Sequence, residues 1–169
     1  MVDVADEAAD AAQTTGPSPI ERCLERWRSH LRGELEGGLD ELLHDDVTFW
    51  SPIVFSPQEG KEITKLYLTA AGTTLVGGDN DSDGASEGGA GGGSSSGGGF
   101  RYVRTISDGH DAVLEFETTM DGLYVNGIDL IRCDDDARIV DFKVMIRPLK
   151  AVNAVHEQMR AMLERLQSG

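Results

Sequence analysis

Hydrophobic positions in the first half of the chain recur with the period of helices. The segment 18–21 (SPIE) predicts a helix start, because serine caps a helix, proline suits its first position and glutamate its third. Apolar residues then fall on one face of this helix, which ends near Gly33: Ile20, Leu24, Trp27 and Leu31. A short helix is expected at 39–43 and a longer one at 61–71, with a strand at 47–50 between them.

The pattern changes to that of strands after residue 99. Four segments rich in Val, Ile, Phe and Tyr follow one another, separated by short turns that contain Asp or Gly: 100–106, 111–118, 123–132 and 138–147. Short turns between successive strands produce antiparallel hairpins. Helices followed by a strand meander, with one early strand, predict an α+β domain.

The C-terminal segment 148–169 is expected to form an amphipathic helix. Pro148 ends the last strand, and apolar residues then recur at intervals of three and four: Val152, Val155, Met159, Met162 and Leu166. A stripe this narrow suits either a partner helix or the body of the domain itself.

Two segments lack the apolar residues that a packed core requires. Residues 1–19 carry four acidic side chains and no basic one, and residues 77–99 carry four more together with 11 of the 21 glycines. Such segments cannot offset the entropy cost of ordering. We therefore expect a disordered acidic tail at 1–19 and a disordered Gly/Ser/Asp-rich insertion at 77–99, inside a folded domain that spans 20–147.

Charge and composition exclude several classes of protein. The net charge of −15 argues against nucleic-acid binding, which needs clustered Lys and Arg. The sequence has neither a long apolar run nor an N-terminal secretory pattern, so a cytoplasmic protein without a membrane partner is expected. Residues 79–84 match half of a calcium loop, but Ala90 replaces its bidentate glutamate. We expect no metal and no cofactor.

Three segments carry a resemblance to a known family: LLHDDVTFWSPI, EGKEITKLY and GIDLIRCDDDARIVDFKVMIRP. Their arrangement over residues 20–147, the glycine-rich insertion apart, resembles the nuclear transport factor 2-like superfamily, in which ketosteroid isomerases and SnoaL-like polyketide cyclases also occur. The resemblance implies a cone-shaped, curved antiparallel sheet packed on the N-terminal helices, as in a cystatin-like or SnoaL-like α+β barrel. It also implies a pocket at one end and a homodimer.

The resemblance further implies where a site would lie. Isomerase-type members use a tyrosine on the first helix, a protonated aspartate in the penultimate strand and a basic aspartate before the proline that follows the first strand. Those positions hold Trp27, Asp129 and Ser51 in this sequence. A serine without a neighbouring base cannot abstract a proton from carbon near neutral pH, and an indole N–H only donates. Isomerase chemistry in its usual form is therefore not expected.

Strand alternation predicts the surroundings of Asp129, because residues two apart share a face of the sheet. The isomerase-like register adds residues from the neighbouring strands and the helical side. The expected pocket is an apolar cup around one carboxyl, lined by Trp27, Phe55, Ala112, Leu114, Phe116, Val125, Ile131, Phe142, Val144 and Ile146. Burial would raise the pKa of Asp129, making it an acid–base or oxyanion-donor residue. Alternatively, Asp129 is structural and bonds to the Trp27 N–H or the backbone. His30 and Cys23 are interpreted as core or boundary residues of the first helix.

Three functions stay open at this point. The first is a pocket that binds a small hydrophobic ligand with Asp129 as its polar group. The second is a cyclase- or isomerase-like enzyme that uses Asp129 as its acid–base residue. The third is an interaction or dimerisation module, with an apolar strip on the open sheet face and the 152–166 stripe as surfaces. The strip consists of Val113, Tyr124, Ile128 and Leu130, and predicts an isologous homodimer.

Overall fold

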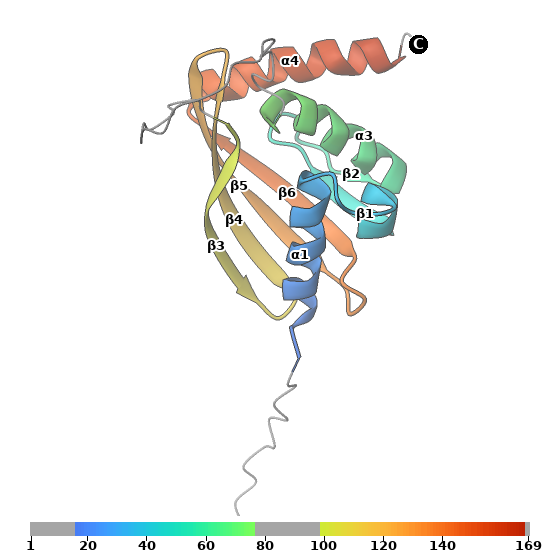
Figure 1. Ribbon diagram of the computed structural model, residues 1–169. Helices are drawn as coiled ribbons and strands as arrows, with labels where there is room; N and C mark the ends of the chain where they lie inside the picture. Colours follow the sequence, from blue (N-terminus) through green and yellow to red (C-terminus); the bar gives the residue numbers. More distant parts are fainter. Residues whose placement is uncertain (1–15, 77–98, 168–169) are drawn as a thin grey trace, which may run out of the picture.

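The computed structural model describes residues 16–76 and 99–167. Most of the tail predicted at 1–19 and of the insertion predicted at 77–99 therefore lies outside the described residues. The elements follow one another as α1 (Pro19–Leu31), α2 (Gly38–Leu42), β1 (Leu43–Trp50), β2 (Gln58–Glu59), α3 (Lys61–Ala71), η1 (Gly72–Val76), β3 (Arg101–Asp108), β4 (Asp111–Met120), β5 (Leu123–Cys133), β6 (Ile139–Arg147) and α4 (Leu149–Gln167) (Figure 1).

The strands form one curved, unclosed sheet in the order β2-β1-β6-β5-β4-β3. The hairpins β3–β4, β4–β5 and β5–β6 are antiparallel, as the short turns predict. The expectation of an antiparallel sheet is wrong at one place, because β1 pairs with β6 in parallel. Helices and four further strands separate these two in the sequence, so no tight turn fixes their relative direction.

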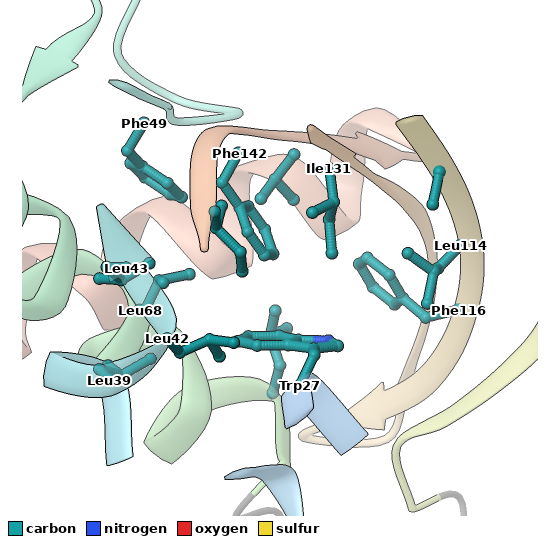
Figure 2. Packing of buried hydrophobic residues seen from close by; sticks show 14 of the residues in the cluster. Trp27, Leu39, Leu42, Leu43, Phe49, Leu68, Leu114, Phe116, Ile131 and Phe142 are labelled. Atoms are coloured by element: carbon teal, nitrogen blue, oxygen red, sulfur yellow. The ribbon is translucent and has the colours of Figure 1, made fainter. Parts of the chain in front are cut away.

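Helix α1 lies across the concave side of the sheet (Figure 1). Its start is the predicted capping box: the Ser18 hydroxyl accepts from the Glu21 N–H at 3.3 Å, and the Glu21 carboxylate accepts from the Ser18 N–H at 2.7 Å. Its buried face presents Ile20, Cys23, Leu24 and Trp27 to the core. The indole of Trp27 faces Phe142 and Phe116 from the helical side (Figure 2), with ring centroids 5.1 Å apart for Trp27 and Phe142.

Helix α4 folds back onto its own domain. It begins at Leu149, directly after Pro148, and buries Ala151, Val155 and Met159 against the body. Its contacts are with β6, α3, β5 and η1, and Figure 1 shows it crossing one end of the sheet. The part of the predicted stripe whose side chains are described thus covers the domain core. None of the helices in the described residues is long and apolar enough to cross a membrane.

Two short elements were not predicted. Strand β2 has only two residues and pairs antiparallel with β1 through Thr48 and Phe49. The π-helical turn η1 continues α3 at Gly72 and brings Leu75 into the core. Strand β2 precedes α3 and contacts it, whereas η1 follows α3 and contacts α4 and β4.

Candidate functional site

A cavity of about 80 Å³ lies between α1 and the concave face of the sheet. Residues of α3, η1 and α4 line its other sides. Its walls are aliphatic and aromatic apart from a few polar groups, which come from three elements: Trp27 and His30 of α1, Tyr102 of β3 and Asp129 of β5. The site is therefore an apolar enclosure in which polar contacts are few and specific.

Asp129 occupies the inner face of β5, opposite Leu114 of β4 and Val144 of β6. Its side chain is buried, with 5% of the residue exposed. One carboxyl oxygen, Oδ2, accepts a hydrogen bond from the Tyr102 hydroxyl at 2.6 Å. Burial raises the pKa of Asp129 to about 7, because the apolar surroundings penalise its charged form, while the Tyr102 hydrogen bond acts in the lowering direction.

The Tyr102 hydroxyl connects Asp129 to α1. It accepts a hydrogen bond from Nε1 of Trp27 at 2.8 Å and donates its own proton to Asp129. Burial, together with the neighbouring charge of Asp129, raises the pKa of Tyr102 well above its usual range. Tyr102 therefore keeps its proton, and the order of donation is fixed from Trp27 through Tyr102 to Asp129.

The second carboxyl oxygen of Asp129, Oδ1, is free of protein partners. Among the described residues no hydrogen bond engages it, and none of their fully buried side-chain oxygens lacks a partner. Since Asp129 borders the cavity, Oδ1 is left accessible from that space. A hydrogen-bonding group placed in the cavity would meet this oxygen.

Most predicted pocket residues lie on the concave side, but only part of them border the cavity. Those that do are Trp27, Phe116, Asp129, Phe142, Val144 and Ile146. Four others are buried in the core and do not border the cavity: Ala112, Leu114, Val125 and Ile131. They form the packed layer that supports the site.

The prediction for Phe55 is wrong. This residue is 99% exposed and does not border the cavity. The reason is the turn that follows β1, where the Ser51 hydroxyl accepts from the N–H groups of Ile53 and Val54 at 3.1 and 3.3 Å. This turn leaves Phe55 outside the cavity, and the Ser51 hydroxyl is engaged by the backbone of the loop.

Two residues of the site were not assigned to it from the sequence. Tyr102 lies in a strand that was predicted, and it pairs with Phe116, a predicted pocket residue. Regular counting from the β3–β4 turn would have paired Tyr102 with Glu117, because the register shift between Tyr102 and Arg104 is not visible in the sequence. His30 stands one helical turn after Trp27, at 5.6 Å between ring centroids, and borders the cavity. Burial lowers the pKa of His30, so its imidazole is neutral near pH 7.

The prediction for Cys23 as a core residue is confirmed. Cys23 of α1 and Cys133 of β5 are both buried and free. Burial raises the pKa of Cys23 to about 12. A thiol that keeps its proton at neutral pH is a poor nucleophile, so neither chemistry nor ligand binding is assigned to it.

Several solved structures of other proteins are similar to this chain. Neither the protein-family models nor the curated proteins gave a match. Among solved structures, a steroid delta-isomerase from Pseudomonas aeruginosa is 30% identical with a TM-score of 0.72, over 90% of this chain and 97% of that one. An uncharacterized protein with a cystatin-like fold from Silicibacter pomeroyi DSS-3 is 28% identical with a TM-score of 0.63, over 82% and 83% of the two chains. An NTF2-like protein of unknown function from Mesorhizobium loti is similar in fold, at 18% identity and a TM-score of 0.55, over 79% and 97%.

Proposed function

The chain belongs to the nuclear transport factor 2-like superfamily, and we propose that it binds a small hydrophobic molecule in the cavity beside Asp129. The observation that carries the proposal is a buried carboxyl with one oxygen held by Tyr102 and the other open to an apolar space. Buried polar groups are normally paired, because an unpaired one costs the free energy of its desolvation. A ligand with one polar group would supply the missing partner.

The chemistry of the ligand follows from the protonation of Asp129. With a pKa of about 7, this carboxyl is protonated in a large fraction of molecules at neutral pH. A protonated carboxyl donates one hydrogen bond, and Tyr102 already donates to Oδ2, so the proton of the acid belongs on Oδ1. The preferred partner is then a carbonyl or hydroxyl oxygen attached to an apolar body.

The volume of the cavity limits the size of the ligand. Pockets for drug-sized ligands measure roughly 300–1,000 Å³, several times the volume found here. The resting cavity therefore suits a molecule of a few non-hydrogen atoms. A larger ligand would need Val155 and Met159 of α4 to move outward, and the flexible methionine is the easier of the two to displace.

Enzymatic activity at Asp129 is a second candidate, favoured by the 30% identity with a steroid delta-isomerase. An aspartate whose pKa lies near 7 suits proton transfer at physiological pH. The position expected for the base holds Ser51, whose hydroxyl is engaged in a turn. Because a serine engaged in this way is not a base, such an activity would need a base at another position.

Binding is tested by titrating the protein with cyclohexanone, a small apolar molecule with one carbonyl oxygen. We expect saturable movement of the Trp27 indole N–H resonance in NMR spectra, because this N–H is linked to Asp129 by two hydrogen bonds through the Tyr102 hydroxyl. Asp129→Leu should weaken binding by about tenfold, the equivalent of one neutral hydrogen bond. Asp136→Leu, which alters an exposed carboxyl in the β5–β6 turn, is the matched control. Equal affinity of the Asp129→Leu and wild-type proteins would contradict the proposal.

The outer face of the sheet is proposed to pair two copies of the chain. Val113, Ile128 and Leu130 are only half-buried there, and Tyr124 is exposed. The ion pairs Arg101–Glu117 and Arg104–Glu115 flank this strip on the same face. An apolar strip with a charged rim suits an isologous contact. Because α4 covers its own domain, the sheet face is the surface that carries this proposal.

Light scattering at micromolar concentration and 0.15 M salt should give twice the chain mass of 18.2 kDa. The association should tighten with salt, because the net charge of −15 repels a second copy until it is screened. Leu130→Glu places a charge in the strip and should give the single-chain mass with an unchanged circular dichroism spectrum. A wild-type mass of 18.2 kDa would contradict the dimer.

A further inference from the structure

We propose that His30 is a general base that removes a proton from the carbon next to a ligand's carbonyl group, while Asp129 donates a hydrogen bond to the carbonyl oxygen. The inference rests on the proposed binding site, because the ligand must occupy the cavity that both residues border. It supplies the base that is lacking at Ser51.

The Trp27 side chain contacts His30 directly and is linked to Asp129 through Tyr102. The imidazole of His30 packs at 5.6 Å from the Trp27 ring, measured between centroids. Nε1 of the same indole donates to Tyr102, which in turn donates to Asp129. His30 and Asp129 both border the cavity, so a ligand bound there lies next to both residues.

His30 is free to accept a proton. Within the described part of the chain its ring nitrogens have no hydrogen-bond partner, and the residue is half-buried. Burial lowers the pKa of His30 below 6.5, so the neutral ring is the dominant form at pH 7. The pKa of Asp129 is shifted in the opposite direction, to about 7. Because the pKa of His30 is lowered and the pKa of Asp129 is raised beside the same apolar cavity, His30 can act as a base and Asp129 as an acid at the same pH.

The proposed step is balanced without a co-reactant. An imidazole nitrogen of His30 takes the proton from the α-carbon, and the electron pair of that C–H bond forms the C=C bond of an enol. The carbonyl π pair takes the proton of Asp129, which becomes a carboxylate hydrogen-bonded by Tyr102. In the reverse step the imidazolium returns a proton to carbon and the enol O–H proton returns to Asp129. Both residues are regenerated.

The test is hydrogen–deuterium exchange of the α-protons of cyclohexanone in D₂O near neutral pD, followed by proton NMR. The wild-type protein should accelerate exchange in proportion to its concentration. His30→Gln and His30→Asn, which keep polar side chains at a half-buried position, should each lower the protein-dependent rate by about 10²-fold. Asp129→Asn should also lower it. His156→Gln, at an exposed position of α4, is the matched control and should leave the rate unchanged.

Binding and exchange are read on the same samples, so the two proposals fail separately. If cyclohexanone shifts the Trp27 N–H resonance but wild-type and both His30 variants exchange at equal rates, the role of His30 is overturned and the binding site stands. If wild-type protein shows no shift and no exchange, both proposals are overturned. Retained binding with lost exchange in both His30 variants supports the base and excludes unfolding as the cause.

Discussion

The free energy of unfolding should fall by about 4 kcal/mol as the pH rises from about 4 to about 7, through Asp129 alone. Burial raises the pKa of this residue from an ordinary value of 3.8 to about 7. Between those pH values the folded state holds a proton that the unfolded state has released, so stability decreases as the pH rises. The gap between the two pKa values, at 1.36 kcal/mol for each pH unit, gives the order of magnitude of the effect.

The contribution of Asp129 is isolated by comparison with Asp129→Asn. Asparagine keeps the shape and can accept from Tyr102 through its amide oxygen, but it carries no charge at any pH. Denaturant unfolding of both proteins at several pH values between 4 and 8 should therefore show the wild type losing stability relative to the variant, with most of the loss below pH 7. Every other titrating group is shared, so the difference belongs to Asp129.

Denaturant unfolding of the Asp136→Asn variant at the same pH values controls for the mere removal of a carboxyl. Asp136 is exposed, so the difference between this variant and the wild type should be flat across the same range. A flat difference for Asp129→Asn as well would mean that Asp129 titrates as an ordinary carboxyl. The cavity would then be wet, and the argument for an apolar ligand would lose its premise.

Local patterns predicted the elements of this fold with accuracy. The capping box of α1 needs only the side chains of Ser18 and Glu21, and the structure contains both of its hydrogen bonds. Helix α3 has the bounds 61–71 that its sequence indicates, and the predicted meander is present as β3, β4, β5 and β6. Period and capping act between residues close in sequence, so they are visible without the tertiary structure.

Contacts between distant segments were less predictable. The parallel pairing of β1 with β6 depends on how helices stack on the sheet, and no turn encodes it. The register shift between Tyr102 and Arg104 interrupts the alternation of β3, so counting along the strand does not reveal which side chains face inward. Phe55 is apolar, yet the turn at Ser51 exposes it.

In the candidate site, too, the features set by local pattern were predictable, whereas the features set by contacts between distant segments were not. Asp129 was found because β5 alternates regularly and because a family resemblance marks its position. The hydroxyl that binds it comes from Tyr102, 27 positions away in the sequence, and the Trp27 N–H bonds to that hydroxyl instead of to Asp129 itself. His30 belongs to the site only because α1 lies across the sheet at this angle, a property of packing that helical period alone does not contain.

Gly127→Ala should destabilise the protein by about 3 kcal/mol, at the upper end of the usual range for overpacking a core. A Cβ atom at this position of β5 would lie 2.4 Å from Cζ of Phe116 and 2.6 Å from the backbone oxygen of Met145. The Phe116 ring is buried and stacked on Phe100 at 5.2 Å between centroids, so it has little room to turn aside. The Met145 oxygen belongs to strand β6, which pairs with β5 at this point, so it cannot withdraw without opening the sheet.

Thermal unfolding monitored by circular dichroism measures the effect. The melting temperature of Gly127→Ala should lie below that of the wild type by on the order of 10 °C. Gly99→Ala is the matched control, because a Cβ atom at Gly99 meets no atom within 4 Å and its backbone is not in the left-handed region. Combining Gly127→Ala with Phe116→Leu removes the clashing ring and should recover part of the loss, while the contact with the Met145 oxygen persists. A melting temperature for Gly127→Ala equal to that of the control would show that β5 and β6 separate freely beside the cavity. The rigid wall that positions Asp129 would then be absent.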